Sequence, residues 1–152
     1  MTDSGISIVN IVSPAPAEVW QSIYEADADA LPSQSRSWAS ALESFGGYRD
    51  VSRFYEFSDG AQAILPLFAG RAPIERYAAQ YSPPAAWGFG GTLSKGPLTS
   101  AHIHAIMRDL SAHRAIITHI RPNPLHADLW NSAMPPEWTS VPRTAHVLDL
   151  GI

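Results

Sequence analysis

The chain has 152 residues, enough for one domain with a substantial core, and its 45% apolar and 16% charged residues exclude an intrinsically disordered protein. A net charge of −4 excludes a general attraction to nucleic acid or to an anionic membrane, so we expect neither as a partner. Because cysteine is absent, disulfides, thiolate nucleophiles and cysteine-based metal sites are excluded as well.

The N-terminal residues, MTDSGISIVN, include an acid and no positive segment, so they do not resemble a secretory signal. No apolar run approaches the roughly 20 residues that a membrane span requires, and we therefore expect a cytoplasmic protein. The first predicted element is a strand over residues 6–12, which ends before Pro14. A helix follows Pro16, because its apolar residues recur at helical spacing.

A second helix is predicted from an N-cap at Ser35 or Ser37 to the glycines at 46–47. Two β-rich runs follow, at 49–57 and 61–68, and the Asp-Gly pair between them indicates a hairpin. The apolar stripe expected on the second helix consists of Trp38, Ala41, Leu42 and Phe45.

Pro66 lies inside the second β-rich run, where it predicts a bulge or an edge position, because proline has no N–H for the ladder. The continuous apolar run at 115–120 predicts a central strand that is covered on both faces. A helix capped by Thr99 is also predicted, and its core side consists of Ile103, Ile106, Met107 and Leu110. The other expected elements are a weaker strand at 74–81, a loop at 82–97, a short helix at 125–133 and a last strand at 144–150.

The resulting order is β-α-α-β-β-β-α-β-α-β. An antiparallel hairpin region in the middle is followed by a helical crossover to an interior strand. This order predicts an α/β (α+β) domain in which helices flank a mixed, mostly antiparallel sheet.

Five short motifs in this order resemble FemAB-like N-acyltransferases of the GNAT superfamily. The first four are the helix entry Gln34-Ser35-x-x-Trp38, the strand pair Pro66-Leu67, the aromatic–glycine loop WGFGGTLSKGPL and the strand end Arg121-Pro122-x-Pro124. The fifth is the strand TAHVLDL at 144–150. They extend over nearly the whole chain, and their collinearity carries the resemblance.

The resemblance implies that residues 1–152 form a single GNAT-like domain, the first, acceptor-side half of a two-domain protein. Such proteins move an acyl or aminoacyl group to an amine, and the donor site lies mainly in the second half. The GNAT pyrophosphate signature is missing here, because GFGGTLSKGPLT fills its place with other spacing. The resemblance therefore implies no cofactor within this chain and assigns acyl-CoA, or aminoacyl-tRNA, to a second GNAT-like domain or subunit.

The acceptor implied by the resemblance is a small-molecule or peptide amine. The residues implied to contact it are Arg36, Trp38, Gly90, Gly91 and Arg121. The sequence marks no catalytic residue among them.

The glycine loop can also be interpreted from its residues alone. Gly88, Gly90 and Gly91 precede the helix at Thr99, and backbone N–H groups in such a position can bind phosphate. Pro97 deletes one donor, and the spacing fits no Walker motif. A structural or acceptor-shaping role is therefore favoured over phosphate binding.

Arg121 follows a strand predicted to be interior, and ligands of α/β sheets bind at the crevice where such strands end. A guanidinium there can bind a carboxylate or phosphate through two hydrogen bonds. The alternative is an arginine that pairs with Asp128 or Asp149. The sequence leaves both interpretations open.

Trp38 lies on the apolar stripe, so a core role is favoured for it, whereas the role of Arg36 stays open. His102 and His104 point to different faces of their helix and cannot bind one metal ion together, and no metal site is expected. His119, on the predicted buried strand, is a candidate general base, although an interior hydrogen-bond donor is the commoner role.

The first hypothesis is thus an acceptor-side half that is inactive alone. The second is a non-catalytic module that binds a ligand or pairs with another chain, with the strand at 144–150 free for β-augmentation. A stand-alone acetyltransferase with a degenerate coenzyme A loop ranks last.

Overall fold

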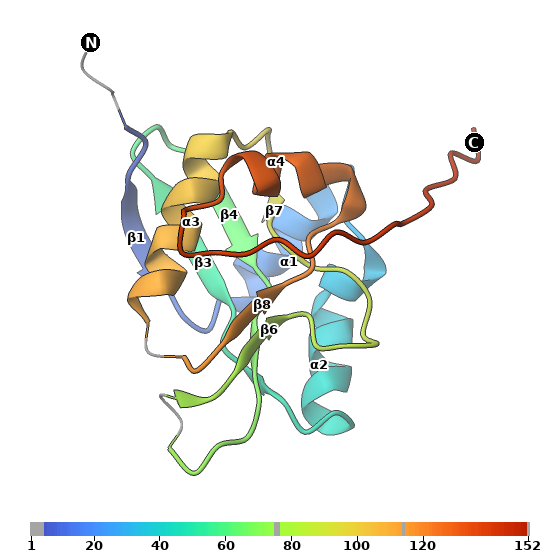
Figure 1. The fold of residues 1–152 in the computed structure, drawn as a ribbon. Coiled ribbons are helices and arrows are strands. Elements are labelled where there is room, and N and C mark those ends of the chain that lie inside the picture. The colour runs from blue at the N-terminus through green and yellow to red at the C-terminus, as the bar shows by residue number, and fades with distance from the viewer. Residues whose placement is uncertain (1–4, 75–76, 114, 152) are drawn as a thin grey trace.

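The computed structural model describes residues 5–74, 77–113 and 115–151, which form a mixed α/β fold (Figure 1). Within these ranges the chain has two four-stranded sheets, and no helix is both long and apolar enough to cross a membrane. The helices are α1 (Ala17–Ala26), α2 (Arg36–Ser44), α3 (Ser100–Ala112) and α4 (Ala127–Ser132), with short 3-10 turns at Pro32–Gln34 and Pro124–His126.

The first sheet is antiparallel throughout and has the order β1-β3-β4-β7. The hairpin predicted at Asp59-Gly60 is confirmed, because this turn joins β3 to β4 and Gly60 adopts a φ of 85° that favours glycine. Strand β7 lies within the segment predicted to be a loop. The strands are β1 (Ile8–Val12), β3 (Arg53–Phe57), β4 (Gln62–Leu65) and β7 (Leu93–Ser94).

The second sheet has the order β2-β5-β6-β8, and β8 runs parallel to β6. Pro66 lies between β4 and β5, where the chain leaves the first sheet and enters the second. The sequence predicts one sheet, whereas the structure has two. The strands of the second sheet are β2 (Arg49–Asp50), β5 (Phe68–Ala69), β6 (Gln80–Ser82) and β8 (Thr118–Ile120). Of the strand predicted at 74–81, only the end is observed, and residues 75–76 lie outside the described residues.

The first sheet has a hydrophobic cluster on each face, because successive residues of a strand point to opposite sides. On one face, Tyr55 and Phe57 pack with the buried residues of α3. On the other face, Phe54 packs with Trp20 and Leu42 of α1 and α2. Each fully buried side chain of this size contributes about 1.5–3 kcal/mol, so β3 and β4 hold the centre of the fold.

Helix ends follow their predicted chemistry in part. Ser35 is the N-cap of α2, and its side chain accepts a hydrogen bond from the Trp38 N–H at 3.2 Å. The stripe predicts a core position for Phe45, but this residue is 87% exposed, because α2 ends at Ser44 and the helical period does not continue past that residue. The core residues predicted for α3 are confirmed: Ile103, Ile106, Met107 and Leu110 are buried.

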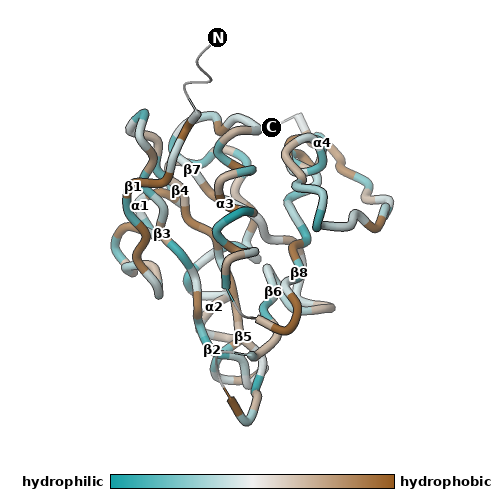
Figure 2. The backbone as a smooth tube through the Cα atoms, turned by 60° about the vertical axis from the view of Figure 1, so that its left-hand side comes forward, coloured by the Kyte–Doolittle hydropathy of each residue, from teal (hydrophilic) through white to brown (hydrophobic). Residues whose placement is uncertain are grey.

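The prediction of a central strand at 115–120 is wrong. Only β8 forms there, at the edge of the second sheet, and Ile116 and Ile117 are 77% and 46% exposed. An apolar run can occupy an interior or an edge strand, and only pairing with the rest of the chain decides between them. In Figure 2 the tube beside the β8 label is brown, the colour of hydrophobic residues.

The last predicted strand is also not observed. Residues 144–150 are extended, but they pair with no strand of the described chain and are exposed. In Figure 1 this segment, in red, leaves the body of the molecule. The observed order of the described elements therefore lacks the final strand that the sequence predicts.

Candidate functional site

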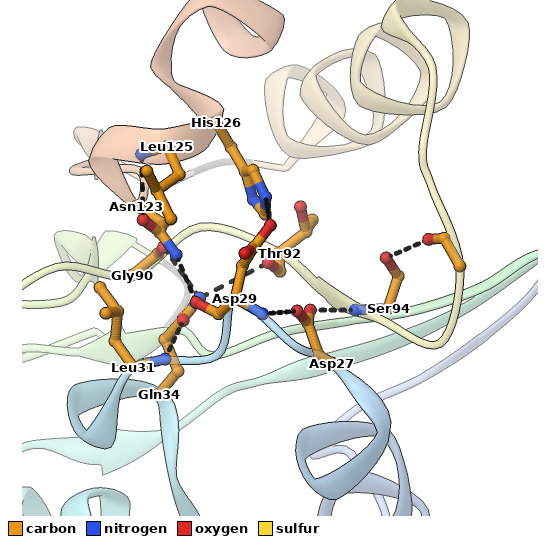
Figure 3. Close-up of polar contacts among 11 residues, drawn as sticks. Asp27, Asp29, Leu31, Gln34, Gly90, Thr92, Ser94, Asn123, Leu125 and His126 are labelled. Carbon is orange, nitrogen blue, oxygen red and sulfur yellow. Dashed lines mark hydrogen bonds and ion pairs between the residues drawn. The ribbon is translucent and has the colours of Figure 1, made fainter. Parts of the chain in front are cut away.

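Three of the motif segments meet at one buried junction, which we call the glycine junction and define as Gln34, Ser82, Gly90, Gly91 and Asn123. Gln34 is buried, and its side-chain amide donates to the carbonyl oxygen of Gly90 at 3.0 Å (Figure 3). The same amide donates to the carbonyl oxygen of Gly91 at 3.3 Å. Its Oε1 accepts from the Leu31 N–H at 3.0 Å. One side chain thus joins the entry of α2 to the glycine loop, 56 residues further on.

The backbone of the glycine loop is occupied by contacts within the chain. The Gly90 N–H donates to the carbonyl of Arg121 at 2.7 Å, and the Gly91 N–H donates to the Ser82 hydroxyl at 3.1 Å. A side chain at Gly90 would lie 2.7 Å from the backbone of Ser82. The loop therefore has a structural role here, and these two N–H groups are not available to a phosphate or an oxyanion.

The same loop holds the strand end that carries Arg121. Besides the Gly90 contact, the Arg121 N–H donates to the Ser82 carbonyl at 2.8 Å, and the Asn123 N–H donates to the Gly90 carbonyl at 2.9 Å. The side chain of Arg121 is half-buried, and among the described residues no ion pair joins it to Asp128 or Asp149. The backbone at Arg121 is thus fixed, while its guanidinium is free to meet a ligand.

An acidic pair that the sequence did not mark lies beside the junction. The Asp29 carboxylate contacts His126 Nε2 at 3.1 Å, and the Asp29 carbonyl accepts from the buried Asn123 amide at 2.7 Å. Asp27 accepts from the Ser94 N–H at 2.9 Å (Figure 3). Both acids belong to the loop that follows α1. Their contacts attach this loop to β7 and to the turn before α4.

Arg36 and Trp38 have partners that limit an acceptor role. Arg36 pairs with Asp50 at 3.2 Å and stacks over the Trp20 ring at 5.2 Å, so its charge is already compensated. The indole N–H of Trp38 donates to the Trp87 carbonyl at 3.0 Å, and the two rings meet edge to face. Trp38 packs against the hydrophobic cluster that contains Phe54 and Trp20, which agrees with the core role favoured for it.

The interior position expected for His119 is wrong, because its side chain is exposed at the edge strand β8, where it meets the Tyr81 ring at 6.4 Å. His104 contacts the Ala133 carbonyl at 2.9 Å, on a different face of α3 from the buried His102. Within the described ranges no group of three or more metal-binding side chains gathers.

The N-terminus of α3 is tied to the β3–β4 turn through His102. Its Nδ1 accepts from the Thr99 N–H at 3.0 Å, so Nε2 carries the proton and donates to Asp59 at 3.0 Å. The Ala61 N–H, which donates to Asp59 at 3.0 Å, and secondarily His102 hold the pKa of the Asp59 carboxyl below its ordinary value.

This shift predicts an acid-sensitive contribution to stability. Because the folded-state pKa of Asp59 is lowered, its contribution is complete above the unfolded pKa of roughly 3.9 and is lost as the pH falls through the folded value. We expect the melting temperature of Asp59→Asn to lie below that of wild type at neutral pH. The difference between the two melting temperatures should shrink as the pH is lowered into the acidic range, because Asp59 of the wild type becomes protonated there. Thermal melts across the acidic range measure it. Asp128→Asn, on the exposed side of α4, is the control and should show no such convergence.

A second polar cluster, which the sequence also did not mark, lies between β3 and α3. The buried Arg53 pairs with Asp109, and the Tyr55 hydroxyl donates to the same carboxylate at 2.8 Å. Burial raises the pKa of Tyr55 far above its ordinary value, so the hydroxyl keeps its proton. His113 Nδ1 lies 3.3 Å from Arg53 Nη1. The cluster holds the C-terminal end of α3 against the first sheet.

Two surface hollows lie away from the glycine junction. The first is bordered by β1 and α3, and the second by α1, β3 and Lys95. Neither is lined by Arg36, Trp38 or Arg121, so these predicted acceptor residues do not share a pocket there. The glycine junction holds the motif segments together. Among the predicted acceptor residues, Arg121 is the one whose charged side chain stays available to bind a ligand.

Comparisons with known proteins give no relative. A scan against protein-family models found no match, and searches of curated proteins and of solved structures found none either.

Proposed function

We propose that the chain is the acceptor-side half of a FemAB-like N-acyltransferase, cytoplasmic, and inactive until a second GNAT-like half supplies acyl-CoA or aminoacyl-tRNA. The observation that supports this is the glycine junction. Three motifs, separated by up to 87 positions in the sequence from Gln34 to Arg121, are joined there by buried hydrogen bonds. Unrelated patterns that arose by chance have no reason to meet in space.

Under this proposal, Arg121 binds the acceptor. Its guanidinium has no partner among the described residues, and its backbone is fixed on both sides, so a carboxylate on the amine acceptor meets a positioned cation. The acceptors of this class are therefore amino acids or short peptides. Arg36, already paired with Asp50, contributes to the position of α2 and not to the acceptor.

Isothermal titration calorimetry tests the proposal. The chain alone should not bind acetyl-CoA, and it should bind a member of a panel of free amino acids and short peptides. Acyl transfer should appear only when a second GNAT-like half is added. Tight binding of acetyl-CoA to the chain alone would instead support the stand-alone acetyltransferase.

Arg121→Ala is expected to weaken acceptor binding by about 1–3 kcal/mol, because a charged hydrogen-bond donor is lost. The free energy of unfolding should stay within about 0.5 kcal/mol of wild type, since this side chain makes no hydrogen bond or ion pair with the described residues. Arg143→Ala, in the exposed C-terminal segment, is the control and should change neither quantity. A destabilised protein with unchanged binding would show that Arg121 has a structural role.

A second candidate, a non-catalytic pairing module, is favoured by the edge strand β8. Its residues and the two exposed isoleucines before it have the composition of an interior strand, and they include no lysine or proline of the kind that protects sheet edges. A second domain or subunit would cover this edge. Cross-linking from position 117 to such a partner, without any acceptor binding, would favour this function.

A further inference from the structure

A groove between β1 and α3 has the form of a site for strand addition. β1 is the edge of the first sheet and pairs only with β3 among the described strands. The groove is lined by Ile8, Val9, Asn10, Ile11, Ala105, Arg108 and Asp109. Extended peptides bind such places by adding a strand to the open edge and placing alternate side chains against the neighbouring helix.

The chemistry of the groove specifies what it binds. Val9 and Ile11 are 63% and 40% exposed, so the edge offers aliphatic contacts, and no lysine or proline within β1 blocks it. The side chain of Arg108 is 65% exposed, and its pair with Glu137 at 4.0 Å is long and solvent-exposed, so its positive charge stays accessible to a second carboxylate. Asp109, in contrast, is engaged with the buried Arg53. The groove therefore fits an extended segment that combines aliphatic side chains with a carboxylate.

This chain contains such a segment. Residues 144–150 are extended and have no strand partner among the described residues, and Val147, Leu148 and Leu150 are exposed on either side of Asp149. Seven extended residues span about 23 Å, which covers the roughly 17 Å of the five-residue strand β1. The aliphatic residues match the edge, and the acid matches Arg108.

The position of the segment favours a second copy over its own chain. The residues that precede it lie beside α3, where Glu137 is 4.0 Å from Arg108 and Trp138 donates to Ser111 at 2.8 Å. From there it runs across the molecule, away from the side that carries β1 (Figure 1). In a symmetric dimer each segment would lie in the groove of the other copy, with the same contact made twice.

We propose that the chain forms a homodimer in which residues 144–150 of each copy add a strand to β1 of the other. The contact buries the exposed aliphatic residues of both surfaces and pairs Asp149 with the other copy's Arg108. The dimer does not depend on acyl transfer or on Arg121.

Sedimentation equilibrium of the full chain over a range of concentrations tests the proposal. Wild type should dimerise, and Val9→Asp with Ile11→Asp should weaken association at least about tenfold. Val147→Asp with Leu148→Asp should have the same effect, and it decides the matter if the β1 variant does not fold, because these two side chains are exposed and outside the core. Phe45→Asp, an exposed apolar residue at the end of α2, is the control and should leave association unchanged.

Charge reversal gives an independent readout. Arg108→Glu should weaken the dimer, and adding Asp149→Lys should restore it. Hydrogen exchange should protect residues 8–12 and 144–150 only at concentrations where the dimer forms. A monomer at every concentration, a dimer that neither pair of substitutions weakens, or protection of both segments in a particle of monomer mass would each overturn the proposal.

Discussion

Asp109→Asn is expected to lower the free energy of unfolding by about 3–5 kcal/mol, more than any other single substitution that we propose. The substitution keeps the shape of the side chain but leaves the buried Arg53 guanidinium without a counter-charge. It also replaces the carboxylate that accepts from the Tyr55 hydroxyl by an amide. A charge taken out of water without compensation accounts for most of the cost.

Denaturant unfolding, monitored by tryptophan fluorescence, measures this effect. The double variant Arg53→Met with Asp109→Leu removes both charges and should recover much of the loss, since a buried pair replaced by apolar groups is often near neutral. Glu137→Gln breaks the exposed pair with Arg108 and should cost no more than about 1 kcal/mol. Equal losses at Asp109 and Glu137 would show that burial is not the cause.

Gln34→Met is expected to cost about 2–4 kcal/mol, because one substitution removes a hydrogen bond from each of three backbone groups. The carbonyl oxygen of Gly91 and the N–H of Leu31 lose the amide as their partner, and the carbonyl oxygen of Gly90 keeps only the bond from the Asn123 N–H among the described residues. Methionine has similar length and no branch, so the loss of volume contributes little.

The same unfolding experiment measures this variant, with Gln21→Met as its control. Gln21 lies on the exposed side of α1, where its side chain donates a hydrogen bond to Glu25, so its substitution should change stability by less than about 0.5 kcal/mol. If Gln34→Met were equally mild, the glycine junction would not be held by this side chain. If stability fell but the exchange rates of the Gly90 and Gly91 amides did not change, the loss would have arisen elsewhere.

Local chemistry explains which elements were predicted correctly. The Asp59-Gly60 turn, the Ser35 cap and the core side of α3 depend on contacts within a few residues, so the sequence shows them directly. No local pattern indicates that the segments around Gln34, Gly90 and Arg121 meet, because the hydrogen bonds that join them connect positions far apart in the sequence.

Tertiary pairing explains the errors. Nothing near residues 115–120 indicates that β8 pairs with β6 alone among the described strands, so an edge strand was predicted as an interior one. Arg53 and Asp109 lie 56 positions apart, in a strand and a helix that each have an ordinary pattern. The role of Arg36 depends on Asp50, which only the fold brings close.

The two hydrophobic clusters on opposite faces of the first sheet have a thermodynamic consequence. Neighbouring residues of β3 belong to different clusters, Phe54 to one and Tyr55 to the other, so neither layer can loosen without disturbing the strand that both share. The helices on the two sides are thereby coupled through a common backbone. Heat should melt them together, in a single cooperative transition.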